Sequence, residues 1–388
     1  MKQLKNLKIA LVHDFLDTYG GAEKVLAVIA EIFPKAPIYT LLYDEKKMRG
    51  KFENREIHTS FLQKFPQWLK NRRRYLLPLM PTAPETFDLR DFDLVISSSG
   101  AWSKGIVTRL NTKHICYMHS PMRFVWDYNE KYLKEIGKKI GFCKRIFLNY
   151  LRIWDYEAAQ RPDILIANSD YTRERIKKYY RRDCDVIYPA VLSLKHENKE
   201  ALKHENVKTI EHKNKETLKQ NIISDYFLVV SRLAAYKKVS LVVEVFNKMG
   251  LPLVVIGEGE EMGKIKKITK DNIKILGWQS DEIVSEYYKN ARALIFPAVD
   301  DFGLTITEAM SQGTPVIAIR KGGAKEIIKE GITGEFFDAQ TMEVLADGVR
   351  RFIEKENSYN KEIIKEDAQK FGKEIFKKEL IELLEREL

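Results

Sequence analysis

Short apolar runs recur along the first half of the chain, and turn residues followed by helical patterns separate them. Residues 8–13 form the first run, and Gly20 and Gly21 precede a helical pattern that opens at residues 22–25. The later runs of strand length are residues 94–97, 114–117 and 164–167. Runs of this length that alternate with helical patterns predict parallel strands joined by helical crossovers. The first half is therefore predicted to be an α/β domain.

The same rhythm returns in the second half. Residues 227–231 predict a strand, residues 239–249 a helix, and residues 253–257 a strand that ends in glycine. Further strands are predicted at residues 273–277, 293–296 and 315–318. Residues 362–388 have the spacing of one or two amphipathic helices. Two such patterns predict two doubly wound domains, and ligands bind such sheets outside the carboxyl ends of their strands.

Residues 193–222 differ from both halves. Lys, Glu, His and Asn dominate them, and Lys-His-Glu-Asn occurs at residues 195–198 and again at residues 203–206. A segment with so few apolar residues cannot build a core, so it predicts an exposed loop between domains. The predicted organisation is a first domain at 1–190, a charged loop at 191–222, a second domain at 223–365, and a final helix at 366–388 that packs back on the first domain.

The composition excludes several classes of protein. Of the 388 residues, 44% are apolar, which is ample for buried cores and excludes global disorder. No apolar run approaches the roughly 18 residues of a membrane-spanning helix, and the apolar stretch after the basic N-terminus is too short for a signal peptide. The three cysteines, Cys116, Cys143 and Cys184, do not have the spacing of a disulfide framework or a zinc site. These features favour a reducing cytoplasm.

The net charge of +11 lies entirely in the first half. Residues 1–190 contain 34 Lys and Arg against 22 Asp and Glu, whereas residues 191–388 contain 32 against 33. Residues 64–74 hold five cations, a tryptophan and no acid, and residues 138–152 mix basic and apolar side chains. Such segments are typical of binding to anionic lipid, and a solvated helix face is the alternative. A basic half also suits nucleic acid, but no nucleic-acid-binding module is recognisable.

The most specific motif lies at residues 300–317, directly after the predicted strand at 293–296. Asp300 and Glu308 bracket a turn at Gly303 that opens a helix. Backbone amides at such a turn can bind an anion, and the two carboxylates can accept hydrogen bonds from sugar or ribose hydroxyls. The ordinary role of either acid, taken alone, is a helix cap or a solvated charge.

Two further motifs follow predicted strands. Arg232 and Lys237 lie five residues apart on one loop and can converge on a diphosphate, although a surface basic pair is the alternative. Gly20 and Gly21 allow a phosphate to approach a helix N-terminus, but they match neither the P-loop nor the dinucleotide fingerprint. His119 follows the strand predicted at 114–117, where a structural histidine is equally ordinary.

Taken in order, these motifs resemble the retaining glycosyltransferases of family 4, which have the GT-B fold. The residues that carry the resemblance are Gly20 to Val25, His119 to Pro121, Arg232 with Lys237, and Asp300 to Glu308. Residues 236–239, 257–259 and 322–326 resemble the branch that includes O-antigen and exopolysaccharide mannosyltransferases. The resemblance covers nearly the whole chain and implies an α/β fold of two doubly wound, Rossmann-like domains that face a central cleft.

The resemblance also implies roles for single residues. Arg232 and Lys237 would hold the donor diphosphate and stabilise its developing charge, and Glu308 would bind the ribose. The other residues implied at the donor sugar and phosphates are Gly20, Gly21, His119, Gly257, Asp300, Phe302, Gly303 and Leu304. His119 would assist catalysis beside the sugar. The family motif usually begins with Glu, and the shorter Asp300 makes a water-bridged contact to the sugar an alternative to direct contact.

The implied activity is transfer of a hexose, with retention, from a nucleotide sugar to a glycan or lipid-linked acceptor. GDP-mannose is the expected donor, with no metal or other cofactor, and the expected location is the cytoplasm, with peripheral binding to the inner face of the cell membrane. The alternatives are a UDP-sugar donor, an epimerase or phosphorylase on the same fold, and a non-catalytic nucleotide-binding relative.

Overall fold

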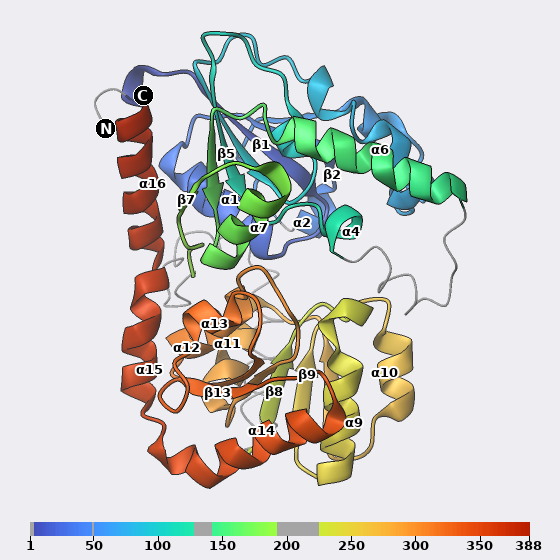
Figure 1. The fold of residues 1–388 in the computed structure, drawn as a ribbon, viewed down its shortest axis with the longest axis vertical. Coiled ribbons are helices and arrows are strands. Elements are labelled where there is room, and N and C mark those ends of the chain that lie inside the picture. Colours follow the sequence, from blue (N-terminus) through green and yellow to red (C-terminus); the bar gives the residue numbers. More distant parts are fainter. Residues whose placement is uncertain (1–3, 49, 128–141, 192–224) are drawn as a thin grey trace, which may run out of the picture. The chain divides into compact units, whose positions relative to one another are not determined.

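The chain forms two compact units, which are described separately. The computed structural model describes residues 4–48, 50–127, 142–191 and 225–388, without the side chains of residues 5 and 142–144. Unit 1 comprises Met1–Ala190 together with Lys373–Leu388, and unit 2 comprises Val191–Gly372 (Figure 1). The loop predicted at 193–222 lies outside the described residues.

Unit 1 is built on a seven-stranded sheet in which every neighbouring pair is parallel. The strand order is β3-β2-β1-β4-β5-β6-β7, so the order reverses between β1 and β4. The strands are β1 Ile9–Leu16, β2 Ile38–Tyr43, β3 Ile57–Thr59, β4 Leu94–Ser99, β5 Lys113–Met118, β6 Ile164–Ala167 and β7 Asp185–Val186. The predicted parallel sheet is confirmed, but β2, β3 and β7 were not among the predicted strands.

The helices of unit 1 include the last one of the chain. They are α1 Gly21–Ile32, α2 Glu45–Met48, α3 Gln67–Lys70, α4 Arg123–Trp126, α6 Phe142–Ala158, α7 Asp170–Tyr180 and α16 Lys373–Glu387. α16 packs beside α1, where Lys373 and Lys377 form ion pairs with Glu31 at 2.7 and 3.0 Å (Figure 1). Burial favours the protonated acid, but the two lysines outweigh it and lower the pKa of Glu31. Among the described helices, none is long and apolar enough to cross a bilayer.

Strand β1 runs three residues past its predicted end, and Asp14 explains the difference. An aspartate after an apolar run predicts a turn, yet this side chain is buried inside the strand. Its carboxylate accepts four backbone N–H bonds of 2.6–2.9 Å from residues 100–103, which follow β4. Four donors compensate for the loss of hydration. Asp14 thereby holds the loop after β4 against the end of β1.

Unit 2 repeats the architecture with six parallel strands in the order β10-β9-β8-β11-β12-β13. The strands are β8 Phe227–Val230, β9 Leu253–Ile256, β10 Ile273–Gly277, β11 Leu294–Phe296, β12 Val316–Ile319 and β13 Gly334–Phe337. The helices are α9 Val239–Met249, α10 Met262–Ile268, α11 Asp281–Asn290, α12 Leu304–Ser311, α13 Ala324–Ile327, α14 Met342–Lys355 and α15 Lys361–Ala368. The order reverses between β8 and β11. Two doubly wound sheets confirm the predicted fold class.

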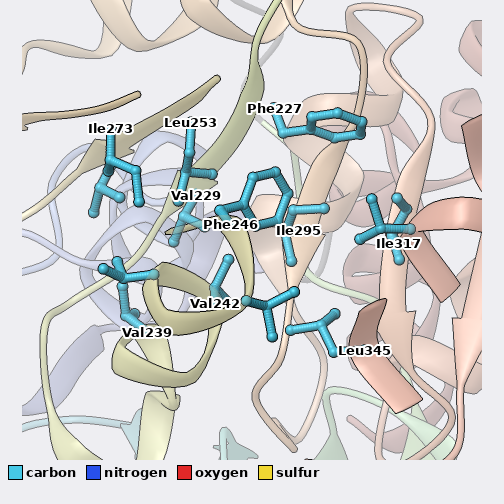
Figure 2. Packing of buried hydrophobic residues seen from close by; sticks show 14 of the residues in the cluster. Phe227, Val229, Val239, Val242, Phe246, Leu253, Ile273, Ile295, Ile317 and Leu345 are labelled. Atoms are coloured by element: carbon cyan, nitrogen blue, oxygen red, sulfur yellow. The ribbon is translucent and has the colours of Figure 1, made fainter. Parts of the chain in front are cut away.

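The main core of unit 2 lies between the sheet and α9, α10 and α14. Figure 2 shows Val242 and Phe246 of α9 pointing toward β-strand side chains such as Val229 and Ile295, with Leu345 of α14 beside them. These side chains are at most 1% exposed. Complete burial of each one stabilises the fold by about 1.5–3 kcal/mol. The apolar residues that recur with helical spacing along residues 239–249 therefore form the face that packs α9 against the sheet.

A fully buried ion pair lies in unit 1. Lys104 Nζ is 2.6 Å from Asp155 Oδ1, and both side chains are 0% exposed. Asp155 Oδ2 also accepts hydrogen bonds of 2.7 Å from Trp126 Nε1 and from Tyr180 Oη. These contacts join α4, α6 and α7 to the loop after β4.

Removing Lys104 should destabilise unit 1 strongly. Lys104→Met leaves the Asp155 charge buried without its cation, which typically costs about 3–5 kcal/mol. We expect the midpoint of thermal unfolding to fall by roughly 10 °C. The matched control is Lys378→Met, because Lys378 pairs with Glu382 at 3.8 Å while both side chains are more than 60% exposed. Equal shifts in the two variants, measured by calorimetry, would contradict the proposed contribution of the buried Lys104–Asp155 pair.

Candidate functional site

In unit 2 the predicted residues gather at the reversal point of the sheet. Arg232 follows β8, and Asp300 lies on the loop after β11, the strand that pairs with β8. Lys237 ends the short 3-10 helix at Ala235–Lys237 that leads into α9. Because the sheet is parallel, these loops all leave its carboxyl edge. The predicted charged residues therefore lie at the edge of the sheet where ligands ordinarily bind in this type of fold.

The structure brings Lys237 and Asp300 together. The Lys237 ammonium donates to Asp300 Oδ2, and the two side chains are 16% and 17% exposed. Arg232 is exposed and forms no ion pair with any described residue. The site thus contains one internally neutralised pair and one cation available to an anion from solution. The spacing of Arg232 and Lys237 predicted that both converge on a diphosphate, and nothing in the sequence indicated the contact of Lys237 with Asp300.

Two glycines determine how the Arg232 loop is held. Ser231 N–H donates to Ile256 O at 3.0 Å and Leu233 N–H donates to Glu258 O at 2.8 Å, so the loop continues the pairing of β8 with β9. A Cβ at Gly257 would lie 1.9 Å from the Ser231 carbonyl oxygen, and one at Gly259 would lie 2.3 Å from that of Leu233. Gly257 also has φ +135°. Its direct role is to permit this close backbone approach.

The loop at 300–303 is supported in the same way. A Cβ at Gly322 would lie 2.3 Å from the Asp300 carbonyl oxygen, and Gly323 N–H donates to that oxygen at 3.0 Å. The Phe302 side chain is buried against Phe371, with ring centroids 5.4 Å apart. Phe302 is therefore an anchor of the loop, and its side chain faces the core of unit 2.

Helix α12 begins at this loop. Gly303 caps it with φ +107°, a left-handed conformation that favours glycine, and the helix starts at Leu304. The first-turn N–H groups of a helix lack intrahelical acceptors and attract anions. In the second turn Glu308 is only 8% exposed and accepts a hydrogen bond of 3.1 Å from Tyr288 Oη. Burial, followed by the charge of Glu308, raises the pKa of Tyr288, which keeps that phenol a donor.

In unit 1 the Gly20–Gly21 pair opens α1. The backbone at Gly20 is extended, and Glu23 Oε2 accepts its N–H at 2.8 Å. Neither glycine has a positive φ. The sequence indicated a helix start here, but it did not indicate that a carboxylate of the same helix caps it.

His119 lies directly after β5, at the carboxyl edge of the unit 1 sheet. Its Nε2 is 2.7 Å from Ser98 Oγ, and Ser98 Oγ is 3.1 Å from His13 Nδ1. His13 Nε2 is 3.4 Å from Glu23 Oε1, so Glu23 reaches both the glycine loop and a chain that ends at His119. His13, Ser98 and Glu23 were not among the site residues predicted from the sequence. For His13 and Ser98 the available signal was a polar residue within an apolar strand.

No group of His, Cys, Asp and Glu that could hold a metal ion occurs within the described ranges. Cys116 and Cys184 are free thiols, and burial raises the pKa of each to about 12. At neutral pH both therefore remain protonated.

Both halves of the chain match family models of sugar-transferring enzymes. Residues 19–191 match the model of Glycosyltransferase Family 4, and residues 198–371 match that of Glycosyl transferases group 1. The solved structure of Anabaena Alr3699/HepE in complex with UDP-glucose covers 98% of this chain and 100% of that chain, with a TM-score of 0.69 and 17% sequence identity. Such neighbours show that the fold is GT-B.

Two curated relatives align with most of the chain. The uncharacterized glycosyltransferase MJ1178 of Methanocaldococcus jannaschii is 26% identical over 96% of this chain and 94% of its own length. Alpha-1,3/1,6-mannosyltransferase ALG2 of Dictyostelium discoideum is 22% identical over 86% of this chain and 87% of its own length. A shorter match to MJ1607, also of M. jannaschii, covers 32% of this chain and 35% of that relative.

A side chain at Gly257 should disrupt the Arg232 loop. In Gly257→Ala the new Cβ meets the Ser231 carbonyl oxygen and the residue is held at positive φ, so we expect unit 2 to lose more than about 2 kcal/mol of stability. The control is Gly263→Ala in α10, where a Cβ meets nothing within 4 Å. That substitution should leave stability unchanged or raise it slightly. Calorimetric unfolding of both variants is the measurement, and equal behaviour would contradict the proposed role of Gly257.

Proposed function

Because the chain is a glycosyltransferase with the GT-B fold, we propose that it transfers a hexose from a nucleotide sugar to a glycan or lipid-linked saccharide in cell-surface polysaccharide synthesis. The observation that carries this proposal is the exposed, unneutralised Arg232 at the reversal point of the unit 2 sheet. A cation on the loop after β8, whose neighbour β11 is followed by the loop that opens α12, suits a diphosphate.

We assign the donor to the unit 2 residues. Arg232 binds the diphosphate as a planar fork, and Lys237 adds a point charge whose position Asp300 sets. The backbone N–H groups of Gly303 and Leu304 donate hydrogen bonds to the sugar or phosphate oxygens. Glu308, already ordered by Tyr288, accepts hydrogen bonds from the ribose hydroxyls.

The proposed reaction keeps the configuration of the anomeric carbon. The bond between that carbon and the diphosphate oxygen breaks, and the acceptor hydroxyl attacks from the same face. The departing diphosphate oxygen takes the proton of that hydroxyl, while Arg232 and Lys237 stabilise its negative charge. These two cations perform the charge neutralisation for which other enzymes use a divalent ion. His119 is assigned to the sugar side of the reaction.

Mannose from GDP-mannose is the proposed donor sugar. Its support is the sequence resemblance to mannosyltransferases and the long alignment with the Dictyostelium mannosyltransferase. A UDP-sugar is the second candidate, because Anabaena HepE was solved with UDP-glucose. An epimerase or a non-catalytic nucleotide-binding relative would use the same unit 2 residues but would not transfer sugar to an acceptor.

We also propose that unit 1 docks on an anionic lipid surface. Residues 57–84 contain no Asp or Glu, and their cations Lys64, Arg72 and Arg74 are exposed. Trp68 and Tyr75 are 62% and 53% exposed in the same segment. Aromatic side chains between exposed cations are the composition of an interfacial surface.

Helix α6 carries an exposed apolar stripe that also suits binding to a lipid surface. Ile146, Tyr150 and Ile153 are between 51% and 57% exposed and follow helical spacing along one side, next to the exposed Arg145. Its buried side attaches to the same core as Leu62 and Leu76 of the basic segment. Residues 138–141 of the predicted basic stretch lie outside the described residues.

Donor binding should depend on Arg232. In calorimetric titrations with GDP, GDP-mannose, UDP and UDP-glucose, we expect one nucleotide to bind selectively and independently of EDTA. Arg232→Ala should weaken that binding about 10- to 100-fold, the value of a charge-assisted hydrogen bond. Asp300→Asn removes the negative partner of Lys237, so nucleotide should bind as well as or better than in the unchanged protein, while sugar transfer falls.

The control is Arg350→Ala, which removes an exposed arginine on α14, away from the carboxyl edge of the sheet. Unchanged nucleotide affinity in Arg232→Ala would contradict the diphosphate assignment. Nucleotide binding without transfer to any acceptor, in both the unchanged protein and Asp300→Glu, would favour the non-catalytic alternative.

Vesicle binding should depend on anionic lipid and on the basic segment. We expect co-sedimentation with phosphatidylglycerol-containing vesicles and none with phosphatidylcholine alone. Replacing Arg72 and Arg74 by alanine should weaken binding at least tenfold, at about 1 kcal/mol per cation. The matched control replaces Trp278 and Arg350 of unit 2, which are also exposed. Equal binding to both vesicle types would contradict the proposed surface.

A further inference from the structure

A continuous polar chain crosses the carboxyl edge of the unit 1 sheet. It runs from Glu23 Oε1 to His13 Nε2 at 3.4 Å, from His13 Nδ1 to Ser98 Oγ at 3.1 Å, and from Ser98 Oγ to His119 Nε2 at 2.7 Å. The other Glu23 oxygen, Oε2, accepts the Gly20 N–H at 2.8 Å. Four side chains from α1, β1, β4 and the residue after β5 are thus joined in one line.

The sheet itself holds this chain in position. His13 and Ser98 are register partners on the adjacent strands β1 and β4. The backbone N–H of His119 donates to Ser99 O at 2.8 Å, and Asn168 Nδ2 donates to His119 O at 3.0 Å. His13 is 2% exposed and Ser98 is 0% exposed, so water does not replace their contacts. The chain is a property of the folded sheet, since its members lie far apart in sequence.

The donors and acceptors of Ser98 restrict where the protons lie. A hydroxyl has one hydrogen to donate and lone pairs to accept others. Ser98 Oγ can therefore donate to only one of the two imidazoles, and the other imidazole must donate to it. A neutral imidazole has one N–H and one acceptor nitrogen, so the choice at Ser98 determines the tautomer of both rings.

Glu23 determines which atoms donate and which accept along this series of hydrogen bonds. Burial favours its protonated form, but the hydrogen bonds from the His13 ring and from the Gly20 N–H outweigh burial and lower the pKa of Glu23. An ionised carboxylate only accepts, so a His13 ring with a single proton carries it on Nε2 and accepts at Nδ1. Ser98 then donates to His13, and His119 Nε2 donates to Ser98.

We infer that Glu23, His13 and Ser98 are positioning residues that hold His119 as the Nε2–H tautomer, with its Nδ1 as the basic nitrogen. The link to catalysis rests on the proposed function, whereas the tautomer does not. In sugar transfer, an Nδ1 with a lone pair can accept a hydrogen bond from a sugar hydroxyl, and the opposite tautomer would present an N–H donor there. The helix start at Gly20 is connected to the same chain through Glu23.

An isosteric change at Glu23, three contacts away from His119 in this series, should reverse the tautomer. In Glu23→Gln the carbonyl oxygen of the amide stays on the Gly20 N–H, so its NH₂ group faces His13 Nε2. His13 must then accept at Nε2 and donate from Nδ1 to Ser98, and Ser98 must donate to His119 Nε2. The proton of His119 is thereby moved to Nδ1, without any change at His119 itself.

The measurement is ¹⁵N–¹H correlation of the histidine rings in full-length protein labelled on histidine, at pH 8. His119→Gln and His13→Gln assign the two rings. We expect His119 as a single Nε2–H tautomer in the unchanged protein, Nδ1–H in Glu23→Gln, and an averaged mixture in Ser98→Ala. The matched control is Ser97→Ala, which removes a 2.8 Å contact to His114 Nε2 from the neighbouring position of β4 and should leave the His119 signals unchanged.

Two spectroscopic results would overturn the inference. His119 as the Nδ1–H tautomer in the unchanged protein would mean that His13 is an imidazolium that donates to Ser98. Unaltered His119 signals in both Glu23→Gln and Ser98→Ala would mean that the chain does not control the tautomer.

Enzyme assays separate this inference from the proposed function. We expect Glu23→Gln to lower kcat about tenfold or more, with a smaller change in the KM of the donor, since the change acts through a group that assists the reaction. If the tautomer reverses but no nucleotide sugar is turned over even by the unchanged protein, the proposed function fails and the positioning chain stands. If the tautomer reverses in a protein that does turn over and kcat is unaffected, the link to catalysis is wrong.

Discussion

Every described strand in both units pairs in parallel, and this constraint determines where chemistry can occur. Parallel pairing places all carboxyl ends on one edge, and the reversal of strand order separates two loops there. Arg232 and Asp300 follow the strands at the reversal in unit 2. In unit 1 the corresponding edge holds His13, Ser98 and His119. His13 and Ser98, and likewise Lys237 and Asp300, are more than sixty positions apart in sequence and become neighbours in this way.

Close backbone contact is the second constraint, and it acts through glycine. Gly257, Gly259 and Gly322 stand where any Cβ would meet a carbonyl oxygen of an adjacent loop. These contacts fix the loops that carry Arg232 and Asp300. The positions of these charged side chains therefore depend on contacts between backbone atoms of neighbouring loops. This arrangement explains how the glycines shape the loops of the candidate site without contributing a side chain to it.

Charge is neutralised selectively at these edges. Asp300 pairs with Lys237 and leaves Arg232 without an ion pair among the described residues. Asp14 is satisfied by four backbone donors, and Glu23 by His13 and Gly20. A buried carboxylate that accepts several hydrogen bonds is a fixed acceptor, and it can therefore orient the donors around it. The tautomer proposed for His119 is one consequence of such a fixed acceptor.

The sequence by itself determined the α/β class, most strands of unit 2, and the loops on which Arg232, Lys237 and Asp300 lie. Apolar runs of strand length and turn glycines are local signals, so they can be detected in a linear chain. The tertiary structure alone decided that Asp14 continues β1, that Lys237 pairs with Asp300, that Tyr288 donates to Glu308, and that His13 and Ser98 connect Glu23 to His119. A polar residue in an apolar strand has no local feature that names its partner. The partner is set by strand order and register, which depend on the packing of the whole sheet.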